Sequence, residues 1–310
     1  MSSVSPATRR APGPRIESAD WPTLAVAAAT YTAYALLTWF YHILPWWLVL
    51  AGGGYVVCLH GSLQHEAVHG HPTRWPWVNA LVVFPSLWLW LPYSHYRETH
   101  LAHHRDERLT DPADDPESYY VSPADWAAMG PLHRTIRRTL TTLAGRLLLG
   151  PPYAVWRAAA DAVQAARRGD RRHLRHWLWH APAVAVVLVW AIGICRIPPA
   201  EYVLLFAYPG LSLTLLRSFA EHRAAAAVAQ RTAVVEAGPA MGLLYLNNNL
   251  HALHHAEPGL VWHQRPRRYR ARRDELLAAN GGYRFRGYGE QFARYLFKGK
   301  EPTVHPLATV

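Results

Sequence analysis

The stretch Leu24–Ile43, LAVAAATYTAYALLTWFYHI, runs for 20 residues without a charge. A helix of about 20 mostly apolar residues crosses the roughly 30 Å hydrocarbon core of a bilayer. Comparable runs lie at Trp46–Leu63, Trp177–Cys195 and Tyr202–Leu216. Buried core helices of a large soluble protein are the alternative, but charge-free runs of this length are rare there. The sequence therefore predicts an all-α membrane protein with four transmembrane helices.

The positive charge of the chain is distributed unevenly. The formal net charge is +11, with 32 Lys and Arg residues. Most Arg residues fall in the N-terminal tail, in residues 97–175 and in residues 265–294, whereas the loops near residue 45 and at 196–201 hold one Arg between them. The positive-inside rule then predicts two hairpins of two helices each, with the tail, the middle segment and the C-terminal third in the cytoplasm. No nucleic-acid-binding module is visible, so the basic surface is expected to face anionic lipid rather than nucleic acid.

The expected organisation has three parts. Residues 1–20 are predicted to be a disordered tail without a signal peptide, residues 21–265 a membrane domain, and residues 266–310 a C-terminal cytoplasmic extension. Within the domain, the Pro-interrupted run Trp75–Tyr93 is expected to lie in the interface or to re-enter the membrane without crossing it. Its tryptophans either anchor the protein at the interface or line an acyl tunnel; they are Trp75, Trp77, Trp88 and Trp90. Ala154–Arg168 is predicted to be a surface helix.

The spacing of the histidines is the feature of the sequence that points to a metal site. His65–His71, HEAVHGH, begins with H-E-x-x-H, the zinc-protease signature in which two His bind the metal and the Glu is the general base. Two H-x-x-H-H runs follow, at 100–104 and at 251–255. On a helix the positions i, i+3 and i+4 lie on one face, so each H-x-x-H-H run is expected to aim its three imidazoles at one point.

The number of these histidines exceeds what one metal ion needs. With His222, just beyond the fourth apolar run, nine candidates are available, too many for one tetrahedral ion and suitable for two metals. The nine are His65, His69, His100, His103, His104, His222, His251, His254 and His255. Imidazole binds iron, zinc and copper alike, so the ligands alone leave the metal open.

Further polar residues flank the histidine runs. His71 is a candidate for a tenth ligand, for an outer contact or for a surface residue. Ligating imidazoles commonly donate their second N–H to a carboxylate. Candidates for that role, or for solvated acids in a Pro-broken loop, include Asp111, Asp115, Glu117, Glu66, Glu221 and Glu257. Asn247, in the triplet before the last run, is a candidate to hold a metal-bound water or to cap a helix.

The three runs, H-x-x-x-H, H-x-x-H-H and H-x-x-H-H, lie between paired membrane hairpins. In this the sequence resembles the integral-membrane fatty acid desaturase superfamily over about residues 22–265. The resemblance implies that the eight histidines of the runs are metal ligands and that His222 is the additional ligand after the last span. It also implies a cytoplasmic helical cap holding two non-haem irons, with O2 as co-substrate, a lipid acyl substrate and an external electron donor of the ferredoxin, rubredoxin or cytochrome b5 type.

Several activities are compatible with these features. Fatty acid desaturation is the leading expectation, and a carotenoid ketolase or hydroxylase or an acyl hydroxylase would use the same di-iron site. The H-E-x-x-H zinc protease would leave both H-x-x-H-H runs without a role. A membrane metal carrier without enzymatic activity would need polar residues along its spans, where His60 is the main candidate.

Overall fold

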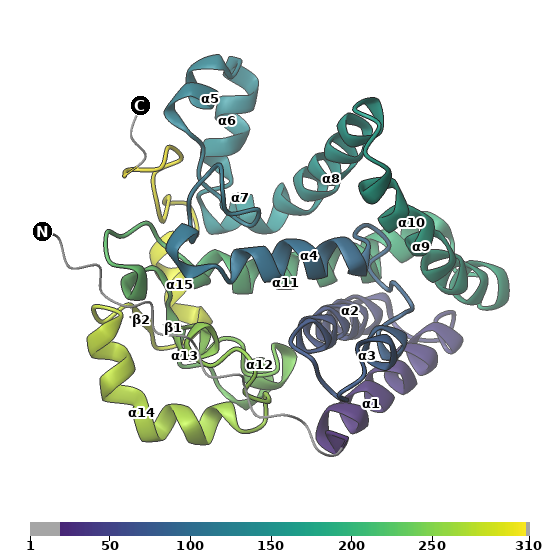
Figure 1. Ribbon diagram of the computed structural model, residues 1–310. Helices are drawn as coiled ribbons and strands as arrows, with labels where there is room; N and C mark the ends of the chain where they lie inside the picture. The colour runs from purple at the N-terminus through teal and green to yellow at the C-terminus, as the bar shows by residue number, and fades with distance from the viewer. Residues whose placement is uncertain (1–18, 308–310) are drawn as a thin grey trace, which may run out of the picture.

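The computed structural model describes residues 19–307, so most of the predicted tail 1–20 lies outside the described residues. The described chain is mostly helical, and one small parallel sheet pairs β1, Val234–Val235, with β2, Arg284–Phe285. Figure 1 shows α4 (Tyr93–His103) and α11 (Tyr208–Glu221) crossing the centre of the molecule, with α1 (Trp21–Trp39), α2 (Trp46–Val68) and α3 (Pro76–Val82) on one side and the helices that follow α11 near the sheet. The helical character of the prediction is confirmed.

Three helices are long and apolar enough to cross a membrane. The first is α2, Trp46–Val68, whose 23 residues correspond to about 35 Å at 1.5 Å per residue. The second joins α9, Arg171–Leu188, to a π-helical turn, Val189–Ile194. The third joins α10, Pro199–Tyr202, a π-helical turn, Val203–Ala207, and α11, Tyr208–Glu221. By length and composition, these three helices fit an integral membrane protein.

Helix α1, Trp21–Trp39, is not one of these three helices, although four spans were expected. It has 19 residues and no charge, but its Thr and Tyr residues lower its mean hydropathy. The hydroxyl groups of Thr30 and Thr38 donate to the carbonyls of Val26 and Tyr34, each at 2.7 Å, so these polar groups are satisfied inside the helix. Helix α1 packs along α2, as a hairpin partner would.

The Trp-rich segment after α2 contains only a short helix, α3, Pro76–Val82. Its seven residues correspond to about 10 Å, far too short to cross a bilayer. Trp75 and Trp77 of this segment are exposed, whereas Trp88 is buried against α2, where its ring closes on Gly61. The four tryptophans therefore do not share one environment.

The remaining helices lie between α2 and α9 and after α11 in the chain (Figure 1). Helix α4 ends in the second histidine run, and α13 carries the third. Helix α8 matches the predicted surface helix 154–168 with nearly the same bounds. These helices are α4 (Tyr93–His103), α5 (Pro123–Ala128), α6 (Pro131–Thr139), α7 (Leu143–Leu148), α8 (Gly150–Arg167), α12 (Pro239–Leu244), α13 (His251–Ala256), α14 (Arg265–Ala279) and α15 (Tyr288–Tyr295), with 3-10 turns at Asp106–Arg108 and Val228–Arg231.

Glycines allow α2 and α11 to pack closely. A Cβ added at Gly53 would lie 2.6 Å from the carbonyl oxygen of Leu205, and one added at Gly54 would lie 2.9 Å from Cβ of Pro209. On the opposing helix, a Cβ at Gly210 would lie 2.5 Å from Cγ1 of Val57. Small residues at such crossings bring two membrane helices close together. This contact fixes α11 relative to α2, and His65 and His222 lie at the C-terminal ends of these two helices.

We expect Gly210→Ala to destabilise the protein by about 1–3 kcal/mol, because the added methyl group overpacks the contact with Val57. The measurement is the thermal unfolding midpoint of the purified protein in detergent. Gly193→Ala is the matched control, since a Cβ at Gly193 meets no atom within 4 Å. An unfolding midpoint for Gly210→Ala at or above that of the control would contradict the close packing of α2 on α11.

Candidate metal centre

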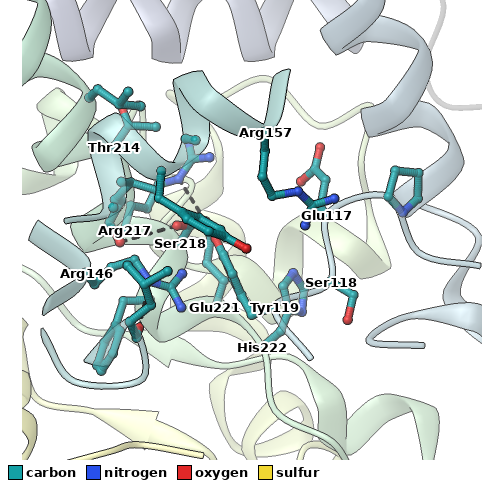
Figure 2. A pocket seen from close by; sticks show the side chains of 18 of the residues that line it. Glu117, Ser118, Tyr119, Arg146, Arg157, Thr214, Arg217, Ser218, Glu221 and His222 are labelled. Carbon is teal, nitrogen blue, oxygen red and sulfur yellow. Dashed lines mark hydrogen bonds and ion pairs between the residues drawn. The ribbon is translucent and has the colours of Figure 1, made fainter. Parts of the chain in front are cut away.

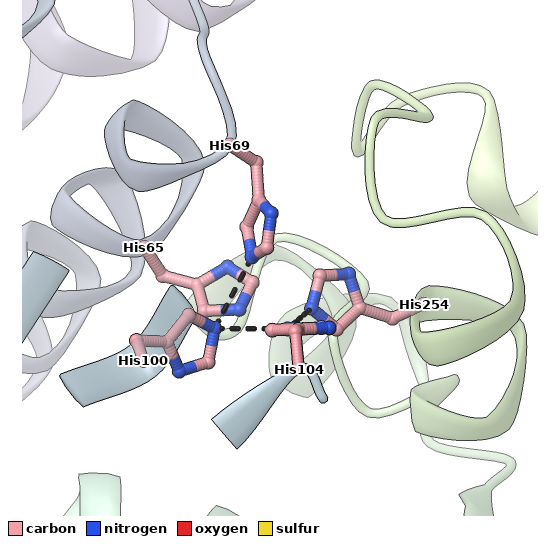
Figure 3. A group of neighbouring side chains, drawn as sticks. All are labelled: His65, His69, His100, His104 and His254. Carbon is pink, nitrogen blue, oxygen red and sulfur yellow. Dashed lines mark hydrogen bonds between the residues drawn. The ribbon is translucent and has the colours of Figure 1, made fainter. Parts of the chain in front are cut away.

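The described residues contain two groups of histidines that could each hold a metal ion. In each group the ligand nitrogens all lie within 4.8 Å of one another. Figure 3 shows the first group, in which rings from the C-terminal ends of α2 and α4 and from α13 point toward one another. The first group is His65, His69, His100, His104 and His254, and the second is His103, His222, His251 and His255. The structure thus brings together all nine histidines singled out by the sequence.

The two groups do not follow the three runs of the sequence. Residues four apart on a helix point about 40° apart, whereas adjacent residues point about 100° apart. The pair His100 and His104 therefore stays in the first group, while His103 turns to the second. In α13 the pair His251 and His255 stays in the second group, while His254 turns to the first. Each H-x-x-H-H run contributes to both groups.

His222 joins the second group from the end of α11, where the backbone becomes extended. An isolated bridge pairs His222 with Thr232, and the ammonium group of Lys300 donates to the carbonyl of His222 at 2.6 Å. These contacts hold the residue after the helix has ended. A residue 78 positions further along the chain thus helps to place this imidazole.

The Nε2 atoms of both groups converge. In the first group His100 Nε2 lies 3.1 Å from Nε2 of both His69 and His104, and His254 Nε2 lies 3.0 Å from that of His104. In the second group the corresponding distances from His222 Nε2 are 3.1 Å to His103 and 3.0 Å to His251.

Hydrogen bonds on the other ring nitrogen decide what these convergent atoms can bind. His103 Nδ1 lies 2.8 Å from Asp115 Oδ1, and His100 Nδ1 lies 2.9 Å from Glu117 Oε1. His222 Nδ1 lies 3.3 Å from the carbonyl of Arg231. Since these oxygens accept, Nδ1 carries the proton of each neutral ring, and Nε2 of the neutral ring presents a lone pair. Lone pairs that converge repel one another unless a cation lies among them, so this donor set fits a metal ion.

Charges around the groups match this arrangement. Burial holds the pKa of His222, His251 and His254 well below the usual histidine value, so these rings are neutral. Burial opposes ionisation of Glu117, but the imidazoles of His100 and His103 outweigh it and lower the pKa of Glu117 to about 2. Burial also disfavours the charged form of His103, but Glu117 and Asp115 raise the pKa of that ring to about 9. A metal at His103 would therefore displace a proton.

Two further carboxylates lie beside the histidines, each paired with an arginine. Glu221 Oε1 lies 3.2 Å from His251 Nδ1 and 2.9 Å from Arg217 Nε. Glu66 lies 3.4 Å from His65 Nδ1 and 2.8 Å from Arg265, and both Glu66 and Arg265 are fully buried. Sequence reasoning missed both arginines. The i, i+4 spacing of Arg217 and Glu221 was a usable signal, whereas nothing local points from Glu66 to Arg265.

Three of the other candidates bond elsewhere. His71 Nε2 lies 3.2 Å from the carbonyl of Gly259. The side-chain amide of Asn247 donates to the carbonyl of Trp262 at 3.1 Å. Asp111 accepts backbone N–H groups of Ala113 and Asp114 and so closes its own turn. None of these three residues belongs to either group of histidines among the described residues.

A cavity of about 330 Å³ reaches the second group of histidines. Figure 2 shows Glu117, Glu221 and His222 around this cavity, together with Arg146 and Arg157. The apolar part of the lining includes Trp88, Trp90 and Leu211. Volumes of roughly 300–1,000 Å³ are typical of small-molecule sites. The histidines therefore have a mostly apolar cavity beside them.

We expect Asp115→Asn to weaken metal binding or activity by about 10–100-fold, as loss of an outer carboxylate commonly does. Asparagine is isosteric but lacks the charge that holds the proton on His103 Nδ1. The measurement is the metal content after dialysis against a graded series of chelator concentrations. Asp111→Asn, in the same loop and outside both groups, is the matched control. Equal metal retention in the two variants would contradict the assigned role of Asp115.

Comparison with known proteins adds independent information. The family model described as fatty acid desaturase matches residues 37–287, which is most of the chain. None of the curated proteins compared with the chain matches it significantly. The family match confirms the resemblance found in the histidine runs and implies an oxidoreductase. The chain belongs to the fatty acid desaturase family.

Proposed function

We propose that this protein is a membrane-bound, non-haem di-iron desaturase that introduces a double bond into a lipid acyl chain. The observation that carries the proposal is the convergence of nine imidazoles into two groups beside a mostly apolar cavity. One iron would be held by the first group and one by the second. When bound, the irons would activate O2 with electrons from outside, which a side chain alone cannot do.

The contributions of the chain itself are positional. Asp115 and Glu117 would keep the proton on Nδ1 of His103 and His100, so that Nε2 stays available for iron. The cavity would exclude water around the acyl chain, and Trp88 and Trp90 would form part of its wall. Of the two roles considered for the tryptophans, these two thus fit the acyl tunnel, and the exposed Trp75 and Trp77 fit the membrane interface.

In the proposed membrane arrangement, α1 crosses the membrane in addition to the three long helices and forms a hairpin with α2. The site then lies on the cytoplasmic side, because both hairpins open toward the Arg-rich segments. Electrons would arrive from a separate ferredoxin, rubredoxin or cytochrome b5-type donor. The outer face of α14 supports docking of an acidic carrier, since Arg267 and Arg270 are exposed there.

The H-E-x-x-H protease is a poorer explanation of the same residues. Its general base would be Glu66, but Glu66 is fully buried and paired with Arg265. Its two metal ligands, His65 and His69, share their group with three further imidazoles. A zinc protease needs an open position for water and substrate, which this crowded group does not offer.

The test combines metal analysis with product analysis. Purified protein is expected to contain about two irons per chain, and membranes supplied with an electron donor and ¹⁸O2 are expected to form an acyl product lighter by two hydrogens. Desaturation sends both oxygen atoms to water, consuming two electrons and two protons from the donor, so the product carries no ¹⁸O. An ¹⁸O-labelled hydroxyl or keto product without a new double bond would replace the desaturase by the hydroxylase or ketolase. A content of one zinc per chain would overturn both.

A further inference from the structure

Two arginines are buried beside the cavity without an acidic partner. Arg137 of α6 and Arg146 of α7 both line the cavity, and each is only 7% exposed. Among the described residues, no carboxylate forms an ion pair with either one. Burying a guanidinium is costly unless its charge is paired, because the charge loses its hydration. Arginine does not avoid that cost by losing its proton.

Both guanidinium groups contact Tyr119. The Arg137 Nη2 group donates to the carbonyl of Tyr119 at 2.5 Å, and the Arg146 guanidinium stacks on the Tyr119 ring with its centre 3.8 Å from the ring centroid. Other neutral partners satisfy part of the remaining groups: Arg146 Nε donates to the carbonyl of Leu140 at 3.1 Å. Nε of Arg137 and Nη1 of Arg146 are buried and have no hydrogen-bond partner.

Four of the five carboxylates that line the cavity are engaged elsewhere. Glu117 accepts from His100, Asp115 accepts from His103, Glu221 pairs with Arg217, and Glu301 accepts from the hydroxyl of Tyr120 at 2.9 Å. The fifth, Asp161, is exposed, and among the described residues it forms no ion pair with Arg137 or Arg146. Burial and the charge of Arg137 both lower the pKa of Arg146, which is the expected result for two like charges held close together without a counter-ion. Arg137 and Arg146 therefore have no counter-ion among the described residues, and an anion bound from outside could fill that role.

The geometry points to an anion subsite: Arg137 and Arg146 bind the carboxylate or phosphate head of an amphiphile whose apolar chain occupies the part of the cavity lined by Trp88 and Leu211. Two donors that remain unpaired in fixed guanidinium forks suit the paired oxygens of either head. The identification of this amphiphile with the substrate rests on the proposed function. Binding of the head does not, because it needs neither iron nor electrons.

The experiment measures equilibrium binding to the full-length protein in a neutral detergent, with decanoate, decyl phosphate and methyl decanoate as radiolabelled probes. At least one of the two anions is expected to bind wild-type protein about tenfold more tightly than the neutral ester, which has a similar chain. Tighter binding of decanoate would identify a carboxylate head, and tighter binding of decyl phosphate would identify a phosphate head. Equal binding of the ester and both anions would overturn the subsite without any variant.

Variants then test the two arginines. Arg146→Met and Arg137→Met are each expected to weaken binding of the preferred anion about tenfold and to leave binding of methyl decanoate unchanged. Arg138→Gln is the matched control, because Arg138 is the exposed neighbour of Arg137 on α6 and does not line the cavity. Wild-type anion binding in both methionine variants would refute the assignment. Anion binding in a protein that oxidises no lipid would instead count against the proposed function alone.

Discussion

Replacement of His254 by alanine is expected to lower lipid oxidation by more than about 100-fold and to reduce the iron content from about two to about one per chain. His254 is fully buried and is the sole member of the first group contributed by α13. Its ring centroid lies 4.6 Å from those of both His65 and His69, so it is central to that group. Loss of an outer partner alone commonly costs 10–100-fold, and loss of a ligand costs more. Iron analysis and product yield are measured on the same preparation.

His263→Ala is the control for this substitution. His263 is also near the third run, but it is exposed, pairs with Asp20 and belongs to neither group. It is expected to retain both irons and full activity. If His254→Ala also retained two irons and full activity, the first group would not be a metal site.

The second large effect concerns stability. Glu66→Ala is expected to destabilise the protein by about 3–5 kcal/mol, because it leaves the Arg265 guanidinium buried without its counter-ion. The carbonyl of Leu246, 3.0 Å from Arg265 Nη1, satisfies one N–H group but not the charge. Glu66→Leu combined with Arg265→Met is expected to recover much of this loss, since both charges are then removed. The unfolding midpoint in denaturant reports both effects.

Glu257→Ala provides the comparison at the surface. Glu257 pairs with Arg268 and Arg272 in a partly exposed position, and such pairs contribute about 1 kcal/mol or less. The same experiment separates the desaturase from the protease. Unchanged stability with complete loss of activity in Glu66→Ala is the result expected of a general base, and it would contradict the structural role argued above.

The sequence alone predicted the parts of the protein that depend on local pattern. Charge-free runs predicted the long helices, and the i, i+4 pairs His100 with His104 and His251 with His255 stay together as expected. The expectation that all three imidazoles of a run point to one place was wrong, because adjacent residues on a helix point about 100° apart. Helix α1 is the exception: its lack of charge predicted a span, but it is not among the three helices that are long and apolar enough to cross a membrane. Long-range contacts were beyond such reasoning. Glu66 and Arg265 are 199 positions apart, and no periodicity in either segment identifies the other as its partner.

The cavity shows the same limit. Trp88 and Trp75 belong to one Trp-rich run, yet only Trp88 faces the cavity, because the chain turns between them. Arg137 and Arg146 look like members of a solvated basic segment in the sequence. Their burial depends on Tyr119, which packs between α6 and α7 from a different part of the chain.

The sharing of each H-x-x-H-H run between the two groups has a consequence for how far apart two metals can be. The crossing occurs between adjacent residues, His103 with His104 and His254 with His255, and in both pairs the ring centroids are 5.8 Å apart. Covalent geometry fixes neighbouring Cα atoms at about 3.8 Å, whatever the surrounding helices do. The backbone therefore limits the separation of the two groups at both adjacent pairs. A rigid shift of α13 against α4 would deform both groups together, but it would leave the Cα spacing within each adjacent pair unchanged.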